Sequence, residues 1–181
     1  MFKGLHFRIP IPDNDDARIK DLHSFKILDT PEEESFDAMT RLAARLFSVS
    51  IALVSLVDKD RQWFKSSHGL DADQTPRDQA FCTYAIIEPE PLIVLDATLD
   101  DRFKDNPLVT GELGIRFYAG APLVSPDNFR LGTFCIIDTK PRDSFHGFEH
   151  NNLIDFATTT VDITEMRKRL LLENDRPIAA E

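Results

Sequence analysis

The sequence is poor in residues that several classes of protein require. Its 7 glycines in 181 residues are dispersed, so the chain has no glycine-rich loop of the kind that cradles phosphates. Its 2 cysteines, Cys82 and Cys135, lie far apart in separate apolar stretches, a pattern of neither a disulfide framework nor a zinc site. We therefore expect a reducing compartment and predict a cytoplasmic protein.

Long apolar runs and positive charge are also scarce. The longest apolar stretch, Ile51 to Val57, has only the length of a strand and contains Ser55, whereas a helix that spans a bilayer needs about 20 apolar residues. Near the start of the chain, Pro10 and Pro12 interrupt the sequence, and we expect no signal peptide. The 31 acidic and 21 basic residues give a net charge of −10, which repels phosphate backbones and anionic lipid. We expect neither nucleic acid nor a membrane as partner.

The remaining composition is that of a globular protein. Hydrophobic residues make up 42% of the chain and charged residues 29%, and the length suits one domain. Residues 1–16 are rich in Pro, Asp and Asn and are predicted to form an N-terminal arm. We predict a single domain over residues 17–174 and a C-terminal tail over residues 175–181.

The first half of the predicted domain contains a helix followed by a hairpin. The run Thr30-Pro31-Glu32-Glu33 is typical of a capped helix start, and apolar residues at helical spacing continue to Phe47. Residues 51–57 are apolar at both parities, which predicts a central strand covered on both faces. Residues 62–66 are predicted to return beside it, with Trp63 and Lys65 on one side and Phe64 on the other.

The second half contains a short helix, a long loop and a second hairpin. A cap at Thr75 is predicted to start a helix through Ile87, and a strand follows at residues 92–95. Residues 96–114 are irregular and acidic, which is typical of a lid or binding loop. Strands over residues 115–124 and 129–137 and a long last helix complete the pattern. This order predicts an α+β fold: an antiparallel sheet of five or six strands, terminal helices on one face, and a cover of loop and short helix on the other.

Several strings of the sequence, in order, resemble the small sensory modules called GAF domains. They are Ile27-Leu-Asp-Thr-Pro31, Ile51 to Asp58, Arg61-Gln-Trp-Phe-Lys65, Phe81-Cys82, Asp96-Ala-Thr98, Asn106-Pro-Leu-Val109, Arg116 to Leu123 and Leu131-Gly-Thr133 through Ile137-Asp138. The resemblance covers about residues 17–173. It implies a signal-sensing module of the type found ahead of bacterial diguanylate cyclases and histidine kinases. We expect this module to bind a small ligand, or none, and to signal to a separate partner protein.

The resemblance also implies where a ligand would sit, namely in a pocket between the sheet and its cover. The candidate residues are Trp63, Phe81, Cys82, Tyr84, Asp96, Asn106, Arg116 and Tyr118. Arg116 and Tyr118 share a strand face, and a buried arginine needs an anion, which would be Asp96 or an acidic group of the ligand. Asp96 and Asn106 flank the long loop and are expected to pin its ends.

Catalytic, metal and cofactor sites find little support in the sequence. The acidic cluster from Asp96 to Asp105 lacks the calcium-loop template, and the 5 histidines lack zinc spacing. We therefore predict a protein without enzyme activity, metal or cofactor. The alternative is a cysteine-dependent redox enzyme or sensor of the free-methionine-sulfoxide-reductase kind. We do not expect Cys82 and Cys135 to form a catalytic pair of that kind, because Cys135 lies in the middle of a strand and would meet Cys82 only by accident of the fold.

The last helix suggests a homodimer. The residues Leu153, Phe156, Thr160 and Ile163 alternate by three and four, Leu170 resumes the heptad, and Ile19 and Leu22 of the first helix could join the seam. The alternative is that this stripe packs on the protein's own sheet, which would leave Arg167 and Leu170 exposed.

Overall fold

A six-stranded antiparallel sheet forms the centre of the molecule in a computed structural model, which describes residues 9–174. The strand order is β3-β2-β1-β6-β5-β4. The strands are β1 (Ile51–Val57), β2 (Arg61–His68), β3 (Gln74–Pro76), β4 (Leu92–Val94), β5 (Phe117–Val124) and β6 (Arg130–Asp138). The α+β fold and both expected hairpins are confirmed.

Strand β1 is central and buried throughout, as its apolar residues at both parities predict. It pairs with β2 on one side and β6 on the other. Strands β5 and β6 form the second hairpin, whose turn contains Asn128 at φ 64°, a conformation that asparagine tolerates. Both faces of the sheet are therefore available for packing.

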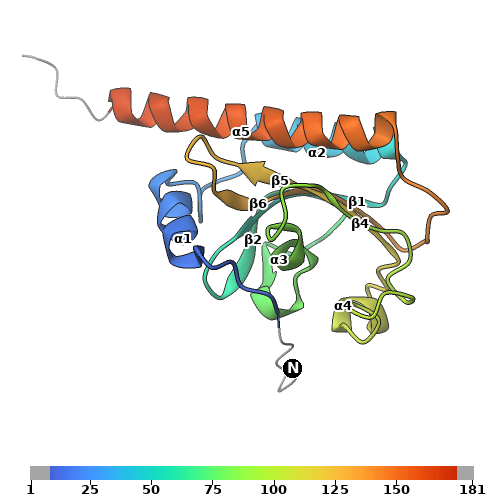
Figure 1. Cartoon of the computed structure of the whole chain (residues 1–181). Coiled ribbons are helices and arrows are strands. Elements are labelled where there is room, and N and C mark those ends of the chain that lie inside the picture. Colours follow the sequence, from blue (N-terminus) through green and yellow to red (C-terminus); the bar gives the residue numbers. More distant parts are fainter. Residues whose placement is uncertain (1–8, 175–181) are drawn as a thin grey trace, which may run out of the picture.

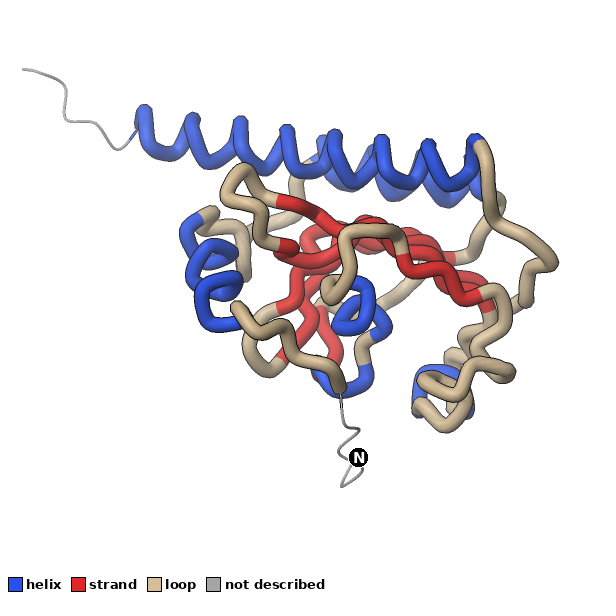
Figure 2. The backbone as a smooth tube through the Cα atoms, viewed as in Figure 1, coloured by secondary structure: helices blue, strands red, loops and turns tan. Residues whose placement is uncertain are grey.

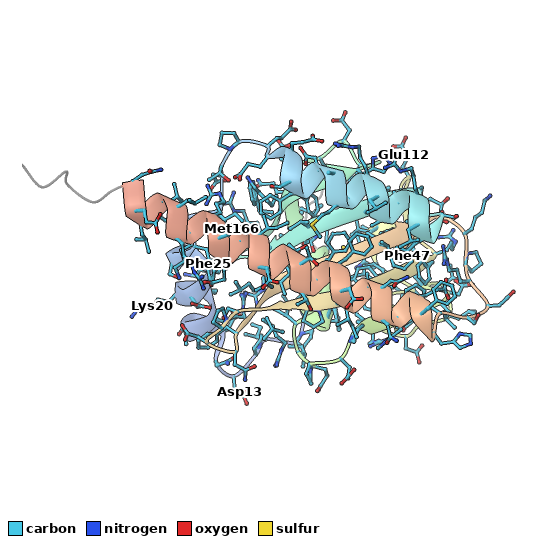
Figure 3. The ribbon with its side chains drawn as sticks, turned by 90° about the horizontal axis from the view of Figure 1, so that it is seen from above. Asp13, Lys20, Phe25, Phe47, Glu112 and Met166 are labelled. Atoms are coloured by element: carbon cyan, nitrogen blue, oxygen red, sulfur yellow. The ribbon has the colours of Figure 1, made fainter. Side chains whose placement is uncertain are left out.

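Two long helices cover one face of the sheet. They are α2 (Glu34–Phe47) and α5 (Phe148–Asn174), and they lie side by side above the strands (Figures 1 and 3). The core beneath them contains Phe36, Phe47, Phe134 and Leu153. No helix within residues 9–174 is both long and apolar enough to cross a membrane.

The opposite face carries the predicted cover. It consists of η1 (Arg77–Gln79), the short helix α3 (Phe81–Ala85), the loop from Asp96, and α4 (Pro107–Thr110) (Figure 2). Phe103 and Val109 of this segment are buried on the sheet together with residues of α3. The loop is thus a packed layer.

Helix α1 (Asp15–Ser24) lies at one end of the sheet and begins inside the segment predicted as an arm (Figure 1). Its Arg18 is 1% exposed and donates to the Val57 carbonyl at 2.7 Å. Asp15 accepts from Arg18 at 2.7 Å and from Arg77 of η1 at 2.8 Å. Two buried arginines therefore share one carboxylate, which connects α1 to the cover.

Neither predicted helix cap forms. Helix α2 begins at Glu34, and the Thr30 hydroxyl instead donates to the Ile27 carbonyl at 2.6 Å. The Glu33 carboxylate accepts from Lys65 and from Arg167 of α5, each at 2.8 Å, because these tertiary ion pairs outcompete the local capping box. In the second case, Thr75 belongs to β3.

The stripe proposed as a dimer seam is used inside the domain. Leu153 and Thr160 are fully buried in the chain's own core, as is Leu22. Leu170 is 56% exposed, as internal packing requires, whereas Arg167 is held by Glu33. The prediction of a dimer seam through Leu153 and Thr160 was therefore wrong, because those side chains pack in the core of their own chain.

Candidate functional site

A buried row of polar side chains lies under helix α3. Strand alternation places Thr133 and Cys135 of β6 on the same face, and Ser55 of β1 pairs directly with Thr133. Cys82 of α3 sits over this row and is 2% exposed, while Cys135, Thr133 and Ser55 are fully buried. The row is surrounded by the apolar residues of the cover-side core.

The structure brings the two cysteines together. Their sulfur atoms are 3.9 Å apart, so the expectation that Cys135 would not meet Cys82 was wrong. The Thr133 hydroxyl donates to Cys82 Sγ at 3.0 Å, and the Tyr118 hydroxyl donates to the same atom at 3.3 Å. We call Cys82, Cys135, Thr133 and Tyr118 the thiol cluster.

The two thiols differ in acidity. Burial raises the pKa of Cys82, but the hydrogen bonds from Cys135, Thr133 and Tyr118 outweigh burial and lower that pKa to about 7. Burial raises the pKa of Cys135 well above its usual value, and the neighbouring Cys82 adds to the effect. Helix α3 has no side-chain N-cap and only 5 residues, so these hydrogen bonds, rather than the start of a helix, lower the pKa of Cys82.

A glycine makes room for Tyr118. A Cβ on Gly120 would stand 2.2 Å from the Tyr118 hydroxyl oxygen and 2.7 Å from its ring carbon Cζ. The tyrosine ring therefore lies across the backbone of its own strand and carries its hydroxyl toward Cys82. Burial raises the pKa of Tyr118 well above its usual value, which keeps this group a donor.

Aromatic rings fill the space in which we expected a ligand. Phe81 stacks on Phe103 with ring centroids 4.0 Å apart and lies 5.1 Å from the Tyr118 ring. Tyr84 meets Phe103 edge-on at 4.9 Å. The expected pocket under the loop is thus closed by side chains. Ligand binding there stays a prediction, and it would require the loop to lift from the sheet.

The polar residues of the predicted site have structural partners. Asp96 accepts from the backbone and hydroxyl of Thr98 at 2.9 and 2.6 Å. Asn106 caps α4 by accepting from Leu108 N at 2.9 Å and donates to the Gln79 carbonyl at 3.0 Å. Both residues hold the loop, as the sequence suggested.

Arg116 does not meet the expected anion. Within residues 9–174 its side-chain hydrogen bonds go to the carbonyls of Val109 and Ile115, at 3.0 and 2.9 Å, rather than to a carboxylate. Backbone carbonyls at the end of the loop thus replace Asp96 as its partners.

Trp63 lies outside the cover side altogether. It belongs to the core under α2 and α5, with Lys65 on the same face, whereas Phe64 points to the cover. The alternation was predicted well, but the assignment of Trp63 to the cavity was wrong. The residues that the sequence analysis missed are Ser55, Thr133 and Cys135, and the signal was the occurrence of polar side chains at alternate positions of apolar strands.

Open clefts occur elsewhere on the described surface. A groove of about 680 Å³ runs between α5 and the segment Pro89–Pro91, and a polar cleft of about 760 Å³ lies beside α2 and β2. Neither is lined by Phe81, Tyr84, Phe103 or Tyr118. Within residues 9–174 no group of three or more His, Cys, Asp or Glu side chains could hold a metal ion.

The family model described as "GAF domain" matches residues 31–166. Over 133 residues the chain is 45% identical to the cyclic di-GMP phosphodiesterase PA2567 of Pseudomonas aeruginosa, a match that covers 74% of this chain and 23% of that protein. The chain belongs to the GAF family, and residues 31–166 form a GAF sensory domain.

Solved structures show the same fold. The GAF domain of an Acinetobacter phosphoenolpyruvate-protein phosphotransferase superposes with a TM-score of 0.61 at 15% identity, covering 85% of this chain and 96% of that one. Free methionine-R-sulfoxide reductase from Neisseria meningitidis, solved with its substrate, gives 0.60 at 14% identity, covering 92% and 99%. At these identities the likeness concerns the fold alone.

Proposed function

We propose that this domain is a non-catalytic signalling module that forms a homodimer. Helices α2 and α5 form the interface between the two copies and pass the state of the domain to a partner protein. The observation that carries the proposal is the apolar outer surface of these helices. Leu42 and Leu46 of α2 are 51% and 52% exposed, and Met166 and Leu170 of α5 are 59% and 56% exposed. We call these four residues the apolar strip.

The spacing of the strip fits a helical interface. Leu42 and Leu46 are four residues apart on α2, and Met166 and Leu170 are four apart on α5, so each pair forms one ridge. The two ridges lie toward opposite ends of the helix pair, because Glu33 before α2 contacts Arg167, whereas Phe47 at the end of α2 contacts Phe156. Exposed apolar ridges of this kind mark surfaces that another helix can cover. This strip replaces the seam through Leu153 and Thr160.

The partner is proposed from the relative. The matched region of PA2567 is part of a cyclic di-GMP phosphodiesterase, and the present chain spans 23% of that protein's length. We propose that this domain regulates an enzyme of cyclic dinucleotide turnover in the cytoplasm.

Sedimentation velocity over a range of concentrations tests the dimer. The wild type is expected to form dimers, and the double variant M166E/L170E is expected to remain monomeric with an unchanged circular dichroism spectrum. Leu99→Glu is the matched control, because Leu99 is 81% exposed on the cover loop, away from the strip. A wild type that stays monomeric at every concentration would contradict the proposal.

One observation favours the alternative, a cysteine-dependent reductase, and that is the 3.9 Å separation of the two sulfurs. Their burial speaks against it, because a reductase must bring its substrate to a sulfur. The assay is reduction of free methionine sulfoxide by the wild type and by the variants Cys82→Ser and Cys135→Ser. Turnover that both variants abolish would establish the reductase in place of the non-catalytic module.

A further inference from the structure

The proposed signalling function does not use the thiol cluster. Four polar side chains from α3, β5 and β6 converge inside an apolar core, although apolar residues would fill the same space without a desolvation cost. Thr133 and Tyr118 both direct their hydroxyl hydrogens at one atom, Cys82 Sγ. This arrangement stabilises negative charge on that sulfur.

The two cysteines are placed for different tasks. Cys82 accepts hydrogen bonds, which favours its thiolate, while Cys135 keeps its proton and lies within reach. A thiolate is the form that reacts with oxidants, and a nearby thiol can then attack the oxidised sulfur. An attacking and a resolving cysteine are thus present in one buried site.

We propose that Cys82 and Cys135 form a peroxide-reactive dithiol, in which hydrogen peroxide oxidises Cys82 and Cys135 closes an intramolecular disulfide. The Cys82 thiolate attacks one peroxide oxygen, the O–O bond breaks, and the departing hydroxide takes a proton to become water. Cys135 Sγ then attacks the sulfenic acid: the S–S bond forms, the S–O bond breaks, and the Cys135 proton leaves in a second water. The two thiols lose two electrons, and peroxide gains them.

The geometry indicates which side of the pair moves. A disulfide needs an S–S distance of about 2.05 Å, so the sulfurs must approach from 3.9 Å. Cys135 is fixed in β6 between β1 and β5, whereas Cys82 belongs to a single-turn helix of 5 residues. Closure therefore draws α3 toward the sheet.

Movement of α3 has a defined path to the rest of the molecule. The Thr83 hydroxyl donates to the Arg77 carbonyl at 2.9 Å, and Arg77 in turn is paired with Asp15 of α1. Oxidation also removes Cys82 as the acceptor for Tyr118 and Thr133, which leaves two buried hydroxyls to find new partners. This regulation goes beyond the proposed dimer and does not rest on it.

Burial determines which oxidant can act. Both sulfurs lie beneath the cover, so only a small molecule can reach them, during local opening of α3. Hydrogen peroxide fits this requirement, whereas a bulky disulfide such as oxidised glutathione does not.

The experiment treats the reduced full chain with hydrogen peroxide, unfolds it in urea, labels free thiols with a maleimide and measures the intact mass. The chain has only 2 cysteines. The wild type is expected to lose two hydrogens and both maleimide sites, and peptide mapping without reductant is expected to join the Cys82 and Cys135 peptides. Cys135→Ser is expected to stop at a sulfenic acid that dimedone traps.

A matched pair of tyrosine variants tests the role of the cluster without removing a cysteine. Tyr118→Phe removes a donor to Cys82 and is expected to slow oxidation about five-fold near pH 7, the effect of raising that pKa by about one unit. Tyr84→Phe removes a hydroxyl from α3 that does not contact the sulfurs and is expected to react as the wild type does.

Three results would overturn the proposal. The first is that both thiols stay free after peroxide treatment of the folded chain and become reactive toward peroxide only after unfolding in urea. The second is a disulfide that joins separate chains. The third is an oxidation rate that is equal in the Tyr118→Phe and Tyr84→Phe variants. The urea comparison uses the wild type alone, so it decides the question even where a cysteine variant fails to fold.

Discussion

Tyr118 lies across Gly120, with its hydroxyl oxygen 2.2 Å from the position that a Cβ on Gly120 would occupy. The strand can accommodate the ring only because this position has no side chain. The same arrangement aims the hydroxyl at Cys82 Sγ, 3.3 Å away. One glycine thus controls both the packing of β5 and the hydrogen bonding of the buried thiol.

Gly120→Ala is expected to lower the free energy of unfolding by about 1–3 kcal/mol, because the methyl group forces Tyr118 out of its rotamer. Chemical denaturation measures the change. Its matched test is the same substitution in a Tyr118→Leu background, where the ring is gone and the cost of the alanine is expected to shrink. An equal cost in both backgrounds would show that another contact is responsible.

The thiol of Cys82 predicts a dependence of stability on pH. Its pKa is about 7 in the folded chain against 9.0 for an ordinary thiol, so between these values the unfolded state binds more protons. Stability is therefore expected to rise with pH, by on the order of 2 kcal/mol in total, and to be lost as pH falls through about 7.

The measurement is the difference between the wild type and Cys82→Ser across this pH range, under reducing conditions, in which the contributions of groups outside the thiol cluster cancel. Above about pH 9 the trend reverses, because the raised pKa of Cys135 favours the unfolded state there. A flat difference between the two proteins would contradict the assignment of the thiolate to Cys82.

Removing the carboxylate shared by two buried arginines is expected to be costly. Arg18 and Arg77 are 1% and 4% exposed, and Asp15 pairs with both. Asp15→Asn is expected to destabilise the protein by about 3–5 kcal/mol, because it leaves buried charge without its partner. Asp16→Asn, at an exposed neighbouring position, is the control and is expected to change stability by less than about 0.5 kcal/mol.

The aromatic packing under the loop predicts that removal of one ring would leave an apolar cavity. Phe103 is fully buried between Phe81 and Tyr84, so Phe103→Ala is expected to cost about 3–5 kcal/mol. An apolar cavity of this kind binds small aromatic molecules, and benzene or indole is expected to raise the melting temperature of the variant but not of the wild type. If neither compound changes the melting temperature of the variant, the loop has collapsed into the cavity left by Phe103.

The sequence predicted the features that depend on local periodicity. The run Ile51 to Val57, the turn at Asn128 and the long helix α5 are as expected, because hydrophobic periodicity and turn chemistry determine them. The predicted start of α2 was wrong because residues distant in the sequence compete for the capping carboxylate. Glu33 would cap α2, but Lys65 and Arg167 offer its carboxylate full charges.

The site was harder to predict because it depends on how elements far apart in the chain meet. Cys82 and Cys135 are neighbours only because α3 lies over β6. In the same way, strand parity separates Trp63 from Phe64, but it does not say which face receives the loop. Arg116 met backbone carbonyls where an anion was expected, since the end of the loop folds back on it.

The anchoring of α5 fixes an angle as well as a position. Arg167 bonds Glu33, and Lys168 bonds Ser24 at 2.9 Å, while the residues 169–174 that follow are exposed apart from residue 171. Each residue of an α-helix turns the chain by about 100° and advances it by about 1.5 Å. A reporter fused after this helix would therefore take an azimuth set by Arg167 and Lys168, and its response to linkers of increasing helical length would oscillate with a period near 3.6 residues.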